Sequence, residues 1–315
     1  MGGLSVCVHA QTTKDVSFGT PLIERVEITR EPAQPEIHLI MRLPKGHTAE
    51  HPTAKGVLAF CTWQGEADAL RGRLANDSDG LVAYAEKHQL ALLTWNTATL
   101  WTTGKSYDQV ARQTLREQDD RFNTVVRFWK VGVGKLCREF GLPEDGFLLY
   151  GFSRGAHWSS RLALRVPEKF LAVYVHVANS YDKPMPSAGK PLWLVSSGDL
   201  DRGRDNAIAF YRECREKGFP MVLKVQNGLG HAESGESRKL LTEFFDYALE
   251  VQKRAKATKR TPAEVMLEKL ATSKLTGDLL SQEVIRGEDV EKIPKEQRVK
   301  LPNEEFARAW GFLRK

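Results

Sequence analysis

The sequence predicts an α/β fold with a mostly parallel central sheet and helices on both of its faces. Short apolar runs alternate with longer segments whose apolar residues recur every three or four positions, as strands followed by helices do. One apolar run, Phe147 to Tyr150, continues directly into Gly151-Phe152-Ser153-Arg154-Gly155 and then into a helical pattern. Such a sequence is typical of a strand, a very tight turn and a helix that follow one another.

Length and composition restrict the class of protein. A chain of 315 residues that is 41% hydrophobic can bury a large core, so we expect one α/β domain with an appendage. The net charge is +6, but Lys and Arg are spread among 40 acidic residues, which argues against a nucleic-acid partner. No stretch approaches the ~20 apolar residues of a membrane span. The histidines show no metal-binding spacing, and no two cysteines are close enough in sequence for a metal or redox motif; they are Cys7, Cys61, Cys137 and Cys214.

Residues 1–20 are predicted as an N-terminal tail or the remnant of a signal peptide. Leu4 to Gln11 resembles the end of a secretory signal, with Val8-His9-Ala10 as a cleavage site of the small-x-small type. The charged region and most of the apolar region of such a signal are missing. The recognisable cleavage site leads us to expect a secreted or periplasmic protein. Because the other regions are missing, a cytoplasmic location is the alternative.

The main domain is predicted over residues 21–252 and begins with an antiparallel hairpin of Ile23–Ile28 and Glu36–Arg42. Strands and helices then alternate as far as the Ser153 turn. The predicted elements are a strand over Val57–Phe60, a helix over Gly80–His88, a strand over Leu90–Trp95 and a helix over about Asp119–Phe140.

The same alternation continues after the Ser153 turn. The predicted elements are a helix over Ala156–Arg165, strands over Leu171–Val177 and Leu192–Val195, a helix over Asp205–Lys217, a strand over Met221–Val225 and a helix over Ser237–Val251. Only about a dozen residues, Asn179–Pro191, link the two middle strands, which is near the minimum for a parallel crossover. No large cap domain fits there, so we expect an open mouth above the sheet.

Residues 253–315 are predicted as an appendage that packs on the main domain, with a partner-binding role as the alternative. The basic run Lys253–Arg260 is interpreted as a hydrated connector. A capping box at Thr261, with proline at the next position, predicts a helix to about Leu275. A second short helix is expected from Asn303 to Gly311, and the residues between the two helices look extended.

The turn at Ser153 indicates a serine hydrolase. The two glycines leave space for a strained backbone that exposes the serine at the tip of its strand. A serine hydroxyl is a poor nucleophile at neutral pH, so an imidazole must accept its proton. A carboxylate must in turn hold that imidazole in the correct tautomer.

From about Leu22 to Val251 the chain resembles the α/β-hydrolase superfamily, whose triad runs Ser, then Asp or Glu, then His. The resemblance implies that Ser153 is the nucleophile and that His231, in a Gly-His loop after the last core strand, is the base. The acid belongs to the turn after Leu192–Val195. A Gly-x-x-Asp pattern selects Asp201, Asp199 is the alternative, and Asp182 follows the preceding strand as the next candidate.

The same resemblance implies an oxyanion hole of two main-chain amides. The amide of Arg154, directly after the nucleophile, is one of them. The other is expected from the loop after Val57–Phe60, where Thr62 and Trp63 remain equal candidates because the family's frequent His-Gly pair is absent.

Four tryptophans are candidates for contacting the substrate. They follow or adjoin the carboxyl ends of strands, the ligand side of an open α/β sheet; they are Trp63, Trp95, Trp101 and Trp158. A rim of this kind suits an aromatic or sugar-bearing ester, although ordinary packing explains the pattern equally well. His157 and His176 are interpreted either as packing residues or as residues that support the active site from behind it.

These observations predict a carboxylic-ester hydrolase that uses no metal and no organic cofactor. An open mouth would admit bulky or polymer-attached esters, in the manner of feruloyl esterases, acetyl esterases and polyhydroxyalkanoate depolymerases. A peptidase of the same superfamily is the second enzymatic hypothesis. A binding protein that has kept the scaffold without catalysis is the alternative from a different class.

Overall fold

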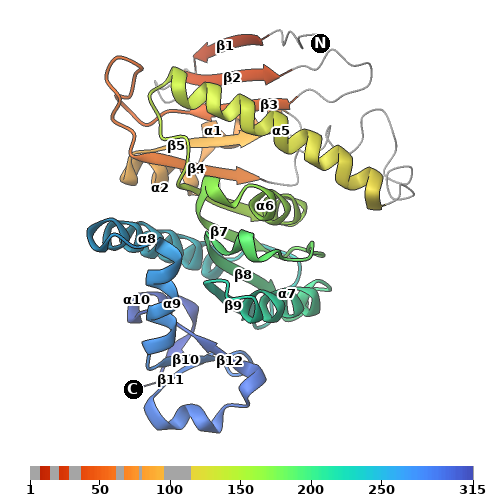
Figure 1. Cartoon of the computed structure of the whole chain (residues 1–315), viewed down its shortest axis with the longest axis vertical. Helices are drawn as coiled ribbons and strands as arrows, with labels where there is room; N and C mark the ends of the chain where they lie inside the picture. The colour runs from red at the N-terminus through yellow and green to blue at the C-terminus, as the bar shows by residue number, and fades with distance from the viewer. Residues whose placement is uncertain are drawn as a thin grey trace. The chain divides into compact units, whose positions relative to one another are not determined.

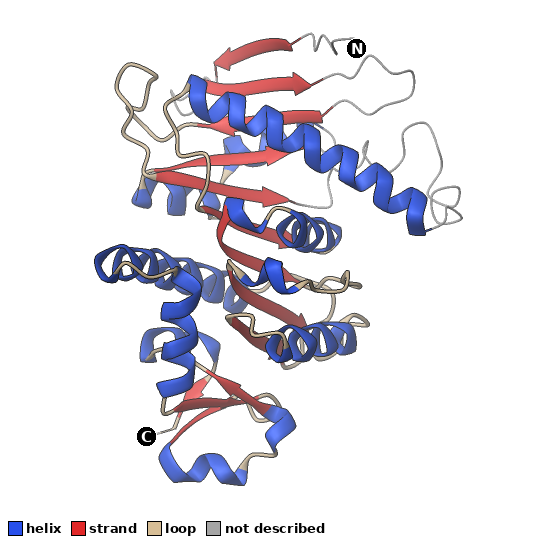
Figure 2. Cartoon of the chain, in the orientation of Figure 1, coloured by secondary structure: helices blue, strands red, loops and turns tan. Residues whose placement is uncertain are grey.

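The computed structural model describes residues 8–14, 21–27, 37–61, 67–77, 80–95 and 115–314 (Figures 1 and 2). The chain divides into two compact units, Met1–Phe147 and Leu148–Lys315. Helices and strands are present in both units. Among the described residues, no helix is both long enough and apolar enough to cross a membrane.

The strands of the first unit lie in the order β1-β2-β3-β5-β4. Their bounds are Val8–Lys14, Pro21–Glu27, Ile37–Arg42, Leu90–Trp95 and Gly56–Cys61, in that order. The predicted hairpin is confirmed, because β2 pairs with β3 antiparallel and places Ile23 opposite Met41. The pair β4 and β5 is parallel, and every residue of β5 is buried.

Residues 8–14 correct the prediction of an N-terminal tail. They form β1, which pairs antiparallel with β2 from Val8 opposite Glu27 to Lys14 opposite Pro21. The ladder with β2 satisfies main-chain groups that would otherwise need water. The helices of this unit are α1 (Ala67–Asn76), which the sequence patterns did not indicate, α2 (Leu81–His88) and α5 (Leu115–Glu139).

The main strands of the second unit lie in the order β6-β7-β8-β9. They span Phe147–Phe152, Phe170–His176, Leu192–Gly198 and Met221–Gln226. β7 and β8 are parallel, as are β8 and β9, and all residues of these three strands are buried. The helices that follow the strands are α6 (Arg154–Arg165), α7 (Arg204–Glu216) and α8 (Gly235–Thr258).

Both faces of this sheet are covered. Trp193 on β8 contacts Phe210 of α7 edge-on, with 6.0 Å between ring centroids. Met221 on β9 pairs with Trp193 and points to the same face of the sheet. Side chains alternate along a strand, so Lys224, three residues later, points to the opposite face. There its ammonium lies over the ring of Trp310. Burial on both faces explains why these strands are continuous apolar runs rather than alternating ones.

The link between β7 and β8 contains one short 3₁₀ turn, Pro186–Gly189, and no inserted domain. The prediction that no large cap fits at this point is therefore confirmed. Asp182 in this link forms ion pairs with Arg161, at 3.0 Å, and with Arg165, at 2.7 Å, both on α6. These pairs fasten the link to the helix that follows the Ser153 turn.

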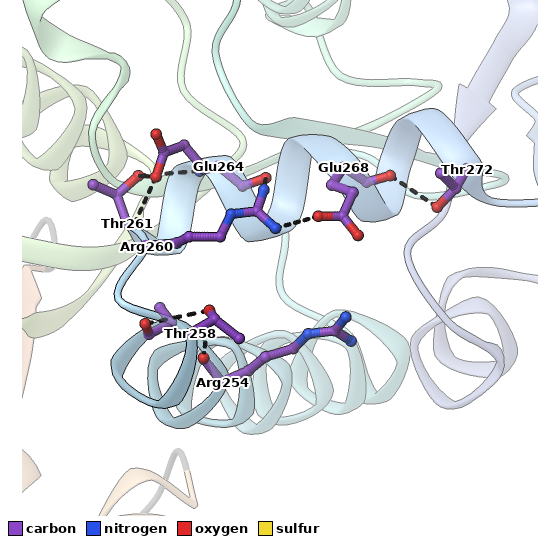
Figure 3. A network of polar contacts seen from close by, with 8 residues as sticks. Arg254, Thr258, Arg260, Thr261, Glu264, Glu268 and Thr272 are labelled. Carbon is purple, nitrogen blue, oxygen red and sulfur yellow. Dashed lines mark hydrogen bonds and ion pairs between the residues drawn. The ribbon is translucent and has the colours of Figure 1, made fainter.

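The basic run is helical, which corrects its interpretation as a connector. α8 continues to Thr258, since Lys, Arg and Ala are good helix formers, and it passes through the predicted boundary at residue 252. Figure 3 shows the corner that follows, where Arg260 pairs with Glu268 and donates to the carbonyl of Glu264. The predicted capping box at Thr261 is present and starts α9 (Pro262–Thr272).

A second sheet takes three strands from the residues between α9 and α10 (Glu304–Trp310), which the sequence patterns indicated only as extended chain, and one strand from the residues after α10. Its strand order is β12-β10-β11-β13, over Arg298–Lys300, Leu275–Asp278, Glu283–Arg286 and Phe312–Leu313. The Trp310 indole donates to the carbonyl of Leu223 at 2.7 Å, and the Lys224 ammonium donates to Gln282 and to the carbonyl of Trp310. Within this unit the C-terminal segment thus packs on β9.

Candidate active site

Ser153 lies alone between a strand and a helix. β6 ends at Phe152 and α6 begins at Arg154, so one residue makes the whole turn with φ 56° and ψ −122°. A positive φ is strained for a residue with a side chain. A Cβ atom on Gly151 would lie 2.6 Å from both the carbonyl of Gly155 and Oγ of Ser159. The motif's first glycine is therefore required for the close approach of α6 to β6.

Three side chains from separate loops of the second unit meet at this turn. Oγ of Ser153 lies 2.7 Å from Nε2 of His231, and Nδ1 of His231 lies 2.5 Å from Oδ2 of Asp201. The carboxylate can only accept, so Nδ1 carries the proton and Nε2 is left to accept from the serine. The Asp201 side chain is fully buried, whereas that of His231 is 37% exposed. This arrangement can activate a serine hydroxyl.

Asp201 has its second carboxylate oxygen occupied as well. The amide of Gly203 donates to Oδ1 at 2.5 Å, so both oxygens have defined partners. Asp199 differs, since its Oδ1 is buried without a hydrogen-bond partner and its carbonyl accepts from Arg204. Burial opposes ionisation of Asp182, but Arg161 and Arg165 outweigh burial and lower its pKa. Of the three candidate acids, Asp201 is the one that the structure brings to His231.

Gly198 brings the acid-bearing and base-bearing loops together. A Cβ atom at this position would lie 1.9 Å from the carbonyl oxygen of Leu229, closer than any real contact. The two loops are also joined by main-chain hydrogen bonds, from Leu200 to Leu229 at 3.1 Å and from Asp199 to Gln226 at 2.9 Å. The position of His231 therefore depends on a glycine at the end of β8.

We expect Gly198→Ala to reduce hydrolytic turnover by at least about tenfold, because the loop carrying His231 must move away from the new methyl group. The matched control is Gly230→Ala in the same loop, where an added Cβ meets nothing within 4 Å. Steady-state kinetics on one ester substrate compare the two variants. Equal losses in both would contradict the dependence on Gly198.

Of the predicted oxyanion donors, Arg154 lies among the described residues. Arg154 is the first residue of α6, at the end of a helix where main-chain amides point outward. Thr62 and Trp63 lie outside the described residues. Trp101 does so as well.

The other two tryptophans proposed to contact substrate are in the core, which corrects the prediction of an exposed rim. Trp95 is 2% exposed and contacts Trp129 edge-on, with 5.5 Å between ring centroids. Trp158 on α6 is 4% exposed. Proximity to a strand end did not reveal which side of the backbone each ring takes.

His176 contacts the loop of the base, in line with the supporting role that the sequence left open beside packing. Its Nε2 lies 3.0 Å from the carbonyl of Ala232, directly after His231, and its Nδ1 lies 2.7 Å from Oγ of Ser196. The hydroxyl of Tyr174 lies 2.8 Å from the same Ser196 oxygen. His176 is fully buried, and burial lowers its pKa to about 4. The ring therefore remains neutral at physiological pH.

The lowered pKa of His176 predicts a loss of stability in acid. An unfolded histidine binds a proton below its ordinary pKa of about 6.5, whereas folded His176 does not until about pH 4. The free energy of unfolding should thus fall as the pH drops from 6.5 towards 4, by roughly 2 kcal/mol at pH 5.

Urea unfolding near pH 7.5 and near pH 5 measures this contribution in the wild type and in His176→Gln. The variant should start from a lower stability and lose about 2 kcal/mol less on acidification. An identical loss in both proteins would show that His176 does not cause the pH dependence.

In the part of the chain that the structure describes, no three His, Cys, Asp or Glu side chains are grouped to hold a metal ion. The three described cysteines are Cys61, Cys137 and Cys214. All three are buried.

The architecture and the site geometry define the class of fold: the chain has the α/β-hydrolase fold. Among solved structures it is similar to an S-formylglutathione hydrolase from Agrobacterium tumefaciens, with a TM-score of 0.53 and 12% identity over 76% of this chain and 98% of that one. It is also similar to a fungal esterase from Rhizomucor miehei, with a TM-score of 0.50 and 12% identity over 79% of this chain and 85% of that one.

No protein-family model matches the chain. No curated protein sequence matches it either. At this identity the solved structures show the fold alone.

Proposed function

We propose that this protein is a serine hydrolase that cleaves carboxylic esters through an acyl-enzyme. The observation that carries the proposal is the hydrogen-bonded series Ser153, His231 and Asp201, which combines a strained, partly exposed serine with a buried carboxylate. The esterase names of solved structures with the same fold support the ester as the bond that is cleaved.

Each group has a defined part in the proposed reaction. Oγ of Ser153 attacks the ester carbonyl carbon while Nε2 of His231 takes the hydroxyl proton, and Asp201 stabilises the resulting imidazolium. The carbonyl oxygen becomes an oxyanion, which we assign to the amide of Arg154 and a second amide from Thr62 or Trp63. The imidazolium then protonates the departing alkoxide, which leaves an acyl-serine. Water, deprotonated by His231, attacks the acyl-serine, and the imidazolium returns the proton to Oγ of Ser153 as the acid is released.

The proposed substrates are bulky, aromatic or polymer-attached esters. The short link between β7 and β8 supports this class, because no domain inserted there encloses the substrate. We assign contact with the bulky group to Trp63 and Trp101. The proposed chemistry requires no metal and no organic cofactor, because the imidazole supplies every proton transfer.

A fluorophosphonate probe tests the proposal, because it labels only a serine that a base has activated. The wild type should be labelled at Ser153, whereas Ser153→Ala should not be labelled. Parallel assays on p-nitrophenyl, feruloyl and acetyl-xylan esters and on peptide substrates identify the bond that is cleaved. An unlabelled wild type would favour a binding protein, and labelling with peptide cleavage alone would favour a peptidase.

A further inference from the structure

The loop that carries His231 is held before the histidine by the main-chain hydrogen bonds from Asp199 and Leu200. It connects β9 to α8 and contains Gly228, with φ 69°, and Gly230. The ring of His231 is 37% exposed, so close packing does not immobilise it. Asp201 binds one ring nitrogen but leaves the main chain of the loop unconstrained on the far side of the histidine.

The first support comes from β7 and acts on the residue after His231. The carbonyl of Ala232 can only accept, so Nε2 of His176 carries a proton and donates to it at 3.0 Å. Nδ1 of His176 is then an acceptor, and the Ser196 hydroxyl donates a hydrogen bond to it at 2.7 Å. Ser196 in turn accepts from Tyr174 at 2.8 Å. Each hydrogen bond in this buried series therefore has one defined donor and one defined acceptor.

The second support comes from β6 and acts on the next residue of the loop. The hydroxyl of Tyr150 donates to the carboxylate of Glu233, and Tyr150 is 5% exposed. Tyr150 lies on β6, three residues before Ser153, which directly follows the strand. The strand that presents the nucleophile thus also binds the loop that presents the base.

The side chains that provide the two supports contact one another. The rings of Tyr150 and Tyr174 lie 5.4 Å apart, and those of Tyr174 and His176 lie 6.0 Å apart. Adjacent strands β6 and β7 therefore hold Ala232 and Glu233 through side chains that pack on one another.

We propose that Tyr150 and His176 are positioning residues that hold the His231 loop, so that Nε2 of His231 stays within hydrogen-bond distance of Ser153. The inference rests on the proposed function, since it assigns a role relative to the general base. Neither residue contacts the reacting atoms. Their effect is on the placement of His231, to which turnover is steeply sensitive.

The expected result is a loss of kcat without a change in KM. Tyr150→Phe keeps the ring and removes only the hydroxyl, and it should lower kcat by about ten- to a hundredfold. The matched control is Tyr247→Phe on α8, which also removes a buried tyrosine hydroxyl but one without a hydrogen-bond partner. The control should retain wild-type kinetics.

Conservative variants separate positioning from a structural role. Glu233→Gln keeps an oxygen that can accept from Tyr150, so it should keep most of the activity that Glu233→Leu loses. His176→Gln keeps a donor for the Ala232 carbonyl and should likewise exceed His176→Leu. Tyr150→Phe combined with Glu233→Leu should lose no more than the worse single variant, because the two changes break the same contact.

Hydrogen exchange of the peptide covering residues 227–236 gives a readout that does not depend on activity. Exchange should be faster in Tyr150→Phe than in the wild type and unchanged in Tyr247→Phe. Unchanged exchange, or faster exchange with normal kcat, would overturn the positioning role. A wild type without labelling or hydrolysis would overturn the proposed function instead, and the exchange data would still decide whether the loop is held.

Discussion

Ser153→Ala is expected to abolish ester hydrolysis, with a loss of at least ~10³-fold in kcat. The variant lacks the oxygen that forms the acyl bond, and no other hydroxyl is hydrogen-bonded to Nε2 of His231 among the described residues. Alanine keeps the Cβ atom, so the strain of φ 56° and the fold should be unchanged. The measurements are kcat on an ester that the wild type hydrolyses and circular dichroism of both proteins.

Ser160→Ala is the matched control for this experiment. Ser160 also lies on α6, but its hydroxyl donates to the carbonyl of His157 and not to a residue of the triad. It should keep wild-type turnover. Activity of Ser153→Ala within tenfold of the wild type, in a folded protein, would remove Ser153 as the nucleophile.

Asp201→Asn is expected to reduce turnover by orders of magnitude, about 10⁴-fold if it behaves as the best-studied triad does. The amide of Gly203 donates to Oδ1 of Asp201, so the carboxamide oxygen of the variant must take that position. Its NH₂ group then faces Nδ1 of His231, which can only accept from it. The imidazole proton moves to Nε2, and the base can no longer accept from Ser153.

Asp199→Asn should have a much smaller effect, because Nδ1 of His231 is hydrogen-bonded to Asp201 and not to Asp199. The comparison is between kcat values of the two variants on the same substrate. The reverse ranking would transfer the role to Asp199. Mild effects of similar size in both would show that neither carboxylate orients the base.

The order of elements could be predicted because it depends on local patterns. Apolar runs that are buried on both faces, such as β7 and β8, are recognisable from composition alone. The capping box at Thr261 and the asparagine cap at Asn303 likewise define helix starts through contacts within three residues. Local patterns did not indicate β1, because its pairing with β2 depends on contacts between segments that are separate in the sequence.

The candidate site was predictable as a set of residue types but not as a geometry. Asp199 and Asp201 lie two positions apart, and the selection depends on which carboxylate turns towards a loop some thirty residues away. The burial of Trp95 and Trp158 was not predictable for a similar reason, since a strand end does not specify the direction of a ring.

The sequence by itself determined the α/β class, the tight turn at Ser153 and the order serine, aspartate, histidine, because each depends on neighbouring residues and their backbone preferences. The tertiary structure alone decided that Gly198 admits the Leu229 carbonyl, that Asp201 faces His231, and that Tyr150 and His176 hold the residues after it. These contacts join segments distant in sequence. Their energies depend on burial and distance, which exist only once the strands have packed together.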